Sequence, residues 1–248
     1  MLSTAKFLQT PPSLWPIQPS LFLDFDGTLV ELVDSPEAII VDPTVLSLLQ
    51  EVRAGLIGRV ALVSGRSVKQ LDRFLGTAAS DLAMVGSHGA EIRVGPNMLC
   101  SPARPLALQA AEQHFKEEFD NIEGVGVEVK SFGVAIHYRL APAAEENANK
   151  AAAIFAKDNG LELQHGKMMV EVRTSGHDKG SGIATLMSMM PFTGHTPIFV
   201  GDDLTDEAGF EMCEAMGGFG VMVGPARETA ARYRLRDVPA VHEWLAAT

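Results

Sequence analysis

The chain has few cysteines, a shortage of basic residues and no long apolar run. Cys100 and Cys213 lie far apart without the spacing of metal ligands, so we expect two reduced thiols and no structural disulfide. Lys and Arg number 20 against 31 Asp and Glu, and the formal net charge of −11 argues against nucleic acid as a partner. No apolar run approaches the roughly 20 residues that a membrane-spanning helix needs. We therefore expect no membrane partner.

The first 19 residues contain four prolines, Pro11, Pro12, Pro16 and Pro19, which interrupt the segment before the apolar stretch of a signal peptide can form. This composition predicts a short leader arm, and we expect a cytoplasmic protein.

Short apolar segments alternate with amphipathic helices in the outer parts of the chain. Helical spacing runs from Asp42, a predicted N-cap, to Gly55. The buried strands are expected at 21–23, 60–63, 83–86 and 197–200. Right-handed strand-helix-strand connections make such a sheet parallel, and its strand ends then open on one edge, where ligands bind. The pattern predicts an α/β fold with a Rossmann-like parallel-sheet core.

The pattern changes between residues 106 and 174. Helical stretches at 106–119 and 143–158 alternate with segments of period two at 125–130 and 134–138, followed by two short strands. Period-two alternation is typical of strands with one solvated face. We expect residues 106–174 to form an inserted α+β domain, with residues 1–105 and 175–248 forming the two parts of the core domain.

Polar residues follow the buried strands. Asp24 and Asp26 are separated by one residue, and two such carboxylates repel each other unless a cation holds them or their pKa values diverge. Gly27 allows a tight turn that points a backbone N–H at a phosphate. Removal of a phosphoryl group needs a nucleophile, a proton donor and positive charge, and two carboxylates with divided roles beside a bound Mg²⁺ would meet these needs.

These residues resemble the four motifs of the haloacid dehalogenase (HAD) superfamily, in order. They are Asp24-Phe25-Asp26-Gly27-Thr28, Ser64-Gly65-Arg66, Asp178-Lys179-Gly180 and the run from Gly201 to Glu207. The resemblance implies that Asp24 attacks phosphorus and forms an aspartyl-phosphate, while Asp26 protonates the leaving oxygen and later activates water. It also implies that Ser64 binds a phosphoryl oxygen and that Lys179 compensates its charge.

The same resemblance implies a Mg²⁺ site. Asp24 and Asp202 would provide carboxylates and Asp26 its backbone carbonyl, with Asp203 orienting the ligands. Asp206 is expected to cap the helix that follows.

The sequence around the motifs is similar to that of trehalose-6-phosphate phosphatases. The segments concerned are 86–91, 128–130, 136–139 and 171–173. In that family a mobile α/β cap lies between the second and third motifs. The resemblance assigns sugar contacts to Glu128, Lys130 and Glu171 of the cap, and to Gly86 and His88 of the adjoining core loop.

Two substrate-contact assignments lie in the motifs themselves, and one position departs from the family. Gly27 is assigned to the phosphate, and Arg66 either contacts substrate or pairs with a neighbouring carboxylate. Thr174 stands where the family is expected to have proline.

The resulting hypothesis is hydrolysis of trehalose 6-phosphate to trehalose and phosphate with Mg²⁺, with a functional link to a trehalose-6-phosphate synthase. Three alternatives stay open: another capped sugar-phosphate phosphatase (for sucrose phosphate or mannosyl-3-phosphoglycerate), a phosphomutase sharing the aspartyl-phosphate, and a non-catalytic sugar-phosphate sensor.

Overall fold

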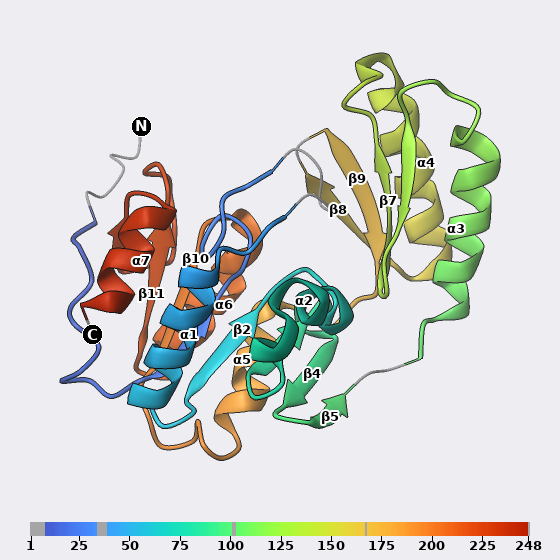
Figure 1. Ribbon diagram of the computed structural model, residues 1–248. Helices are drawn as coiled ribbons and strands as arrows, with labels where there is room; N and C mark the ends of the chain where they lie inside the picture. The colour runs from blue at the N-terminus through green and yellow to red at the C-terminus, as the bar shows by residue number, and fades with distance from the viewer. Residues whose placement is uncertain (1–7, 34–38, 101–102, 167, 248) are drawn as a thin grey trace. The chain divides into compact units, whose positions relative to one another are not determined.

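The computed structural model describes residues 8–33, 39–100, 103–166 and 168–247. The chain divides into two compact units, the first formed by Met1–Ser101 and Asp178–Thr248 and the second by Pro102–His177 (Figure 1). Each unit has a sheet and a core of its own. The function of the second unit as a cap stays a prediction.

The first unit contains, within the described residues, an eight-stranded sheet of order β12-β11-β10-β1-β2-β3-β4-β5. Neighbouring strands from β12 to β3 are parallel, whereas β4 and β5 form an antiparallel edge. The strands are β1 (Ser20–Leu23), β2 (Val60–Val63), β3 (Ala83–Gly86), β4 (Glu91–Val94), β5 (Asn97–Cys100), β10 (Pro197–Gly201), β11 (Phe219–Val223) and β12 (Tyr233–Leu235). The predicted α/β fold with a parallel-sheet core is confirmed.

Helices cover both faces of this sheet because successive strand residues point to opposite sides. Leu21 and Leu23 of β1 pack into a core with α1, α2 and α7, whereas Phe22 packs into a second core with α5 and α6. The helices are α1 (Pro43–Gly55), α2 (Val68–Leu75), α5 (Lys179–Met187), α6 (Glu207–Ala215) and α7 (Val238–Ala246), with 3₁₀ turns η1 (Gly76–Ala79), η2 (Ser87–Gly89) and η4 (Leu204–Asp206).

Helix α1 begins and ends as its sequence predicts. The side chain of Asp42 accepts a hydrogen bond from the backbone N–H of Thr44, and Pro43 occupies the first turn, where its missing N–H costs nothing. Val45, Leu49 and Val52 form its buried side.

The second unit is a four-stranded antiparallel sheet of order β6-β7-β9-β8 with two helices on one face. Its elements are α3 (Leu106–Phe119), β6 (Gly126–Val129), β7 (Gly133–His137), η3 (Pro142–Ala144), α4 (Glu145–Asn159), β8 (Glu162–Gly166) and β9 (Met169–Arg173). Val134 and Ile136 of β7 face the helices, as the period-two pattern predicts.

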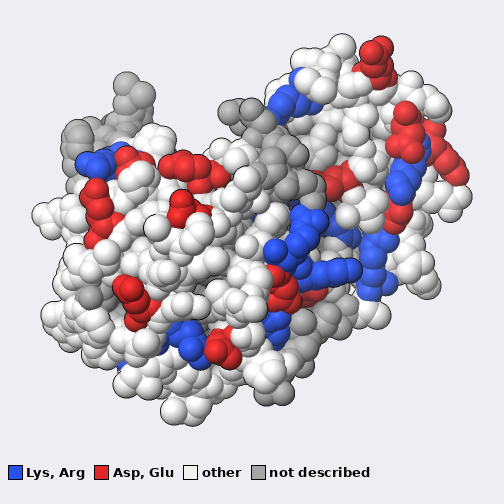
Figure 2. Space-filling model, viewed as in Figure 1, with Lys and Arg blue, Asp and Glu red and all other residues white. Residues whose placement is uncertain are grey.

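The described part of the N-terminal segment lies along β12, and residues 1–7 of the expected leader arm lie outside the described residues. Arg234 N–H donates to the carbonyl of Gln9 (2.9 Å), and the indole Nε1 of Trp244 donates to the carbonyl of Pro12 (2.9 Å). No helix in the described part of the chain is long and apolar enough to span a bilayer. Figure 2 shows acidic side chains scattered over the visible face of the first unit, in keeping with the net charge of −11.

Candidate active site

The candidate site lies at the carboxyl ends of three adjacent strands. β1 is flanked by β2 and β10, and each of these three strands is followed directly by a site residue, Asp24, Ser64 or Asp202. The backbone N–H of Asp24 donates to the carbonyl of Val200 in β10 (2.9 Å), which continues the ladder one residue past β1. The parallel register therefore brings together residues that lie up to 178 positions apart in the chain.

Lys179 lies between two carboxylates. Its Nζ is 2.9 Å from Oδ1 of Asp24 and 2.5 Å from Oδ1 of Asp206. The three side chains are almost completely buried. Lys179 is the first residue of α5, whose N-cap Asp178 accepts a hydrogen bond from the N–H of Ser181, so the start of this helix fixes the lysine backbone.

Carboxylates outnumber ammonium groups at this position. Asp24, Asp202 and Asp206 each offer an oxygen within 4.8 Å of the others. Burial, and then repulsion by Asp206, raises the pKa of Asp202 to about 6. Burial also raises the pKa of Asp24 well above its ordinary value, although Lys179 opposes this. Burial alone would lower the pKa of Lys179, but Asp206 and Asp24 more than offset it and raise this pKa.

This donor set fits a hard divalent cation. Mg²⁺ prefers carboxylate and carbonyl oxygens, and an added cation would balance the negative charge that Lys179 alone leaves uncompensated.

Asp26 is held by Arg66. The guanidinium donates from Nε to Oδ2 (2.6 Å) and from Nη2 to Oδ1 (2.8 Å), a two-pronged pair that fixes the orientation of the carboxylate. The same guanidinium lies over the ring of Phe74, 5.0 Å from its centroid. Of the two expectations for Arg66, the structure therefore shows the pairing with a carboxylate.

Gly27 is a position that requires glycine. Its φ is +73°, and a Cβ there would lie 2.2 Å from Oδ2 of Asp202. The tight turn after β1 thus approaches the acidic cluster directly.

Ser64, Gly86 and His88 pack together. The hydroxyl oxygen of Ser64 accepts a hydrogen bond from Arg66 N–H (3.1 Å), and His88 N–H donates to the carbonyl of Ser64 (3.1 Å). A Cβ on Gly86 would lie 2.7 Å from the backbone nitrogen of Val68. Gly86 and His88 therefore support the loop that carries Ser64.

Glu128, Lys130 and Glu171 lie in the second unit, on the sheet face opposite its helices. Glu128 and Glu171 both stand directly across from Ala135 of β7 and therefore share a face. Lys130 Nζ is 2.6 Å from Oε2 of Glu171, and His137 Nε2 is 2.8 Å from Oε2 of Glu128. The three residues thus share one face of the sheet, on which the carboxylate of Glu171 is buried.

Comparison with known proteins identifies the family. The family model of trehalose-phosphatase matches residues 22–239. Trehalose-6-phosphate phosphatase of Escherichia coli (strain K12) is 36% identical over 230 residues, covering 90% of this chain and 84% of that protein. The chain belongs to the trehalose-phosphatase family. This membership confirms the predicted enzyme class, a phosphoric monoester hydrolase.

Solved structures agree with membership of the trehalose-phosphatase family. The crystal structure of a trehalose-6-phosphate phosphatase related protein is 27% identical, has a TM-score of 0.72, and the match covers 92% of this chain and 95% of that one. A phosphatase of the HAD superfamily from Bacteroides thetaiotaomicron, 18% identical, has a TM-score of 0.64 and covers 91% of this chain and 92% of its own, which supports the fold.

The sequence predicts only a helix cap for one residue of the candidate site, Asp206. It makes no side-chain hydrogen bond to α6 but binds Lys179, while its Oδ2 accepts from Asp203 N–H (2.8 Å). Asp203, expected near the metal, is exposed and lies outside the acidic cluster. The signal for it in the sequence is its position in the fourth motif, four residues after Asp202.

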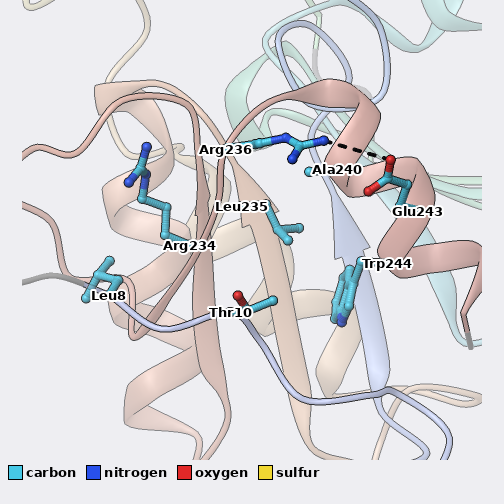
Figure 3. Close-up of a pocket in the computed structure, with 8 residues that line it drawn as sticks. All are labelled: Leu8, Thr10, Arg234, Leu235, Arg236, Ala240, Glu243 and Trp244. Carbon is cyan, nitrogen blue, oxygen red and sulfur yellow. Dashed lines mark ion pairs between the residues drawn. The ribbon is translucent and has the colours of Figure 1, made fainter.

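A cavity of about 510 Å³ on the same unit of this trehalose-phosphatase contains none of these residues (Figure 3). It lies between the N-terminal segment, β12 and α7, and is lined by Leu8, Thr10, Arg234, Leu235, Arg236, Ala240, Glu243 and Trp244.

Proposed function

We propose that this family member hydrolyses trehalose 6-phosphate to trehalose and phosphate, with Asp24 as the nucleophile. The observation that carries the proposal is the buried Lys179 ammonium between Asp24 and Asp206, at the end of the central strand of a parallel sheet. The E. coli relative is a trehalose-6-phosphate phosphatase, which supports the choice of substrate.

In the first half-reaction, a carboxylate oxygen of Asp24 attacks phosphorus, and the bond between phosphorus and the sugar oxygen breaks. Asp26 gives its proton to that oxygen as trehalose leaves. Lys179 and the Ser64 hydroxyl balance charge on the transferring phosphoryl group. Ser64 is suited to this because its oxygen accepts from Arg66 N–H and its proton is then available to the phosphoryl oxygen.

In the second half-reaction, water attacks the phosphorus of the aspartyl-phosphate, and Asp26 takes a proton from that water. The bond between Asp24 and phosphorus breaks, which releases phosphate and restores the carboxylate. Arg66 keeps Asp26 oriented between the two steps through its paired hydrogen bonds.

Mg²⁺ would be held by the carboxylates of Asp24 and Asp202 and by the backbone carbonyl of Asp26. When bound, it supplies positive charge that the phosphate and the acidic cluster share. Lys179 lies between Asp24 and Asp206, where it orients the Asp24 carboxylate and opposes the rise in the pKa of Asp24 that burial causes.

The second unit, in this proposal, acts as a cap that recognises the sugar. Glu128, Lys130 and Glu171 offer charged hydrogen-bonding groups on one face, which suits a disaccharide rich in hydroxyls. A trehalose-6-phosphate synthase would supply the substrate.

Phosphate release from a panel of esters tests the proposal. The panel is trehalose 6-phosphate, sucrose phosphate, mannosyl-3-phosphoglycerate and glucose 6-phosphate, each with Mg²⁺ and with EDTA. We expect the highest kcat/KM for trehalose 6-phosphate, with activity lost in EDTA and restored by Mg²⁺.

Each alternative has its own signature. Preference for another panel member would replace the substrate, conversion of an ester without free phosphate would indicate a mutase, and saturable binding without turnover would indicate a sensor. Any of these results would overturn the proposal.

A further inference from the structure

A turn outside the four motifs contacts two segments that carry candidate-site residues. It lies between β3 and β4, where Ser87, His88 and Gly89 have φ values of 49°, 53° and 105°. Left-handed backbone is unfavourable for residues that have a Cβ. Because two of these three residues are not glycine, their surroundings must hold this turn in place.

One side of the turn contacts the loop after β2. Ser87 N–H donates to the carbonyl of Arg66 (2.7 Å), and His88 N–H donates to the carbonyl of Ser64 (3.1 Å). A Cβ on Gly65 would lie 2.5 Å from Nε2 of His88, so the imidazole lies against the backbone between Ser64 and Arg66.

The other side contacts the start of the helix that carries Lys179. A Cβ on Gly89 would lie 2.2 Å from the carbonyl oxygen of Asp178. The turn therefore packs between the Ser64 loop and the backbone next to Lys179, and any shift of the turn moves these two groups relative to each other.

Glu91 fastens the turn. Its Oε2 accepts one hydrogen bond from the Ser87 hydroxyl (3.0 Å) and one from the backbone N–H of Val68 (2.9 Å). Val68 is the first residue of α2, so its N–H has no acceptor inside the helix. Glu91 is 8% exposed, and no basic side chain among the described residues pairs with it. Its hydrogen bonds therefore account for its burial.

We propose that Glu91 is a positioning residue for phosphoryl transfer. By joining Ser87 to the start of α2, it clamps the loop from Ser64 to Arg66 against the turn and fixes the distance between the Ser64 hydroxyl and Lys179. The inference rests on the proposed function, because it takes Ser64 and Lys179 as the groups that contact the phosphoryl oxygens.

The test compares Glu91→Leu, Glu91→Gln and Ser87→Ala with the wild type, measuring Tm, kcat and KM for trehalose 6-phosphate with Mg²⁺. We expect E91L to lower kcat about 10- to 100-fold with KM changed less than about threefold, because misplacing Ser64 affects mainly the transition state. E91Q should keep kcat within about threefold, since its amide oxygen can accept both hydrogen bonds. S87A leaves the hydrogen bond between Glu91 and Val68 intact and should lower kcat about three- to tenfold.

A matched control separates positioning from stability. Asp237 also accepts a backbone N–H at a helix start, from Ala240 in α7 (2.9 Å). D237A should lower Tm to a similar extent and leave kcat unchanged. In a Ser64→Ala background, E91L should lower kcat less than about threefold further, because the group that Glu91 positions is already gone.

Three results would overturn the inference. They are an unchanged kcat in E91L, equal reductions of kcat in E91Q and E91L, and a reduction of kcat in D237A as large as that in E91L. If E91L does not fold, S87A decides, and wild-type kcat in S87A overturns it. If the wild type does not hydrolyse trehalose 6-phosphate, the proposed function fails by itself, and the same variants are compared on the panel ester that the wild type does hydrolyse.

Discussion

Asp24 is 4% exposed, and this burial is the main reason that its pKa lies well above the ordinary value. Lys179 favours the carboxylate form, whereas burial and the carboxylates of Asp206 and Asp202 oppose it. If Asp24 is the nucleophile, as proposed, its ionisation depends on Lys179, and changes of charge around the two groups should have large effects on rate.

Asp24→Asn tests the nucleophile. The amide has nearly the same shape but cannot attack phosphorus, so we expect turnover to fall by at least about 10³-fold. Binding should survive, and saturating trehalose 6-phosphate should still raise the Tm of the variant. Turnover near the wild-type rate would contradict the assignment.

Asp206 and Asp203 provide a matched pair, because they lie in one turn and only Asp206 contacts Lys179. We expect Asp206→Asn to lower kcat at least about tenfold and Asp203→Asn less than about threefold, since only the first removes charge next to the ammonium. Steady-state phosphate release measures both. The reverse order would favour the assignment of Asp203 made from the sequence.

The sequence predicts Asp24, Ser64, Lys179 and Asp202 as one group because each follows a recognisable strand or motif, and the structure brings Asp24, Lys179 and Asp202 into one cluster. It does not predict that Arg66 pairs with Asp26 or that Asp206 is buried. Both depend on packing between segments far apart in the chain.

At the scale of elements, α1, β2, β3 and α3 follow their local signals closely, whereas α7 and the edge strands β4, β5 and β12 were not anticipated. β12 has three residues and pairs with β11, so little in its own sequence marks it as a strand. Such short elements form because a neighbouring strand supplies hydrogen-bond partners.

In the sheet of the second unit, the missing side chain of Gly133 leaves room for the carboxylate of Glu171. A Cβ there would lie 2.0 Å from Oε1 of Glu171, so Gly133→Ala should displace this carboxylate from Lys130. If these residues bind the sugar, KM for trehalose 6-phosphate should rise about tenfold, a loss of about 1.4 kcal/mol, while hydrolysis of p-nitrophenyl phosphate is unaffected.

Gly126→Ala in β6 is the control for this prediction, because a Cβ there meets nothing within 4 Å. Equal effects of the two substitutions on KM would exclude a specific effect through the position of the Glu171 carboxylate.

At the scale of the whole molecule, the acidic cluster links folding to pH. The pKa of Asp202 is raised to about 6 from an ordinary value of 3.8, so between these values the folded protein binds more protons than the unfolded chain. Without metal, stability should therefore fall as pH rises through this window.

Asp202→Asn should remove the loss of stability that ionisation of Asp202 causes in the folded protein. In EDTA at pH 7, we expect its Tm to exceed that of the wild type by about 6–12 °C, corresponding to about 3 kcal/mol, with little difference at pH 4. Asp81→Asn, at an exposed position, should show no such pH dependence. Mg²⁺ should raise the Tm of the wild type and of Asp81→Asn but not that of Asp202→Asn. A Tm difference of the same size at both pH values would contradict the explanation.

The segment around Gln9 and Pro12 lies along β12, the outermost strand of the large sheet, and Gln9 takes up one of its outward N–H groups. An exposed edge strand has unpaired backbone N–H and C=O groups that can pair with a strand of another chain, which is a common route to aggregation. Trimming these residues would uncover such an edge, so we expect the shortened chain to aggregate more readily than the full chain.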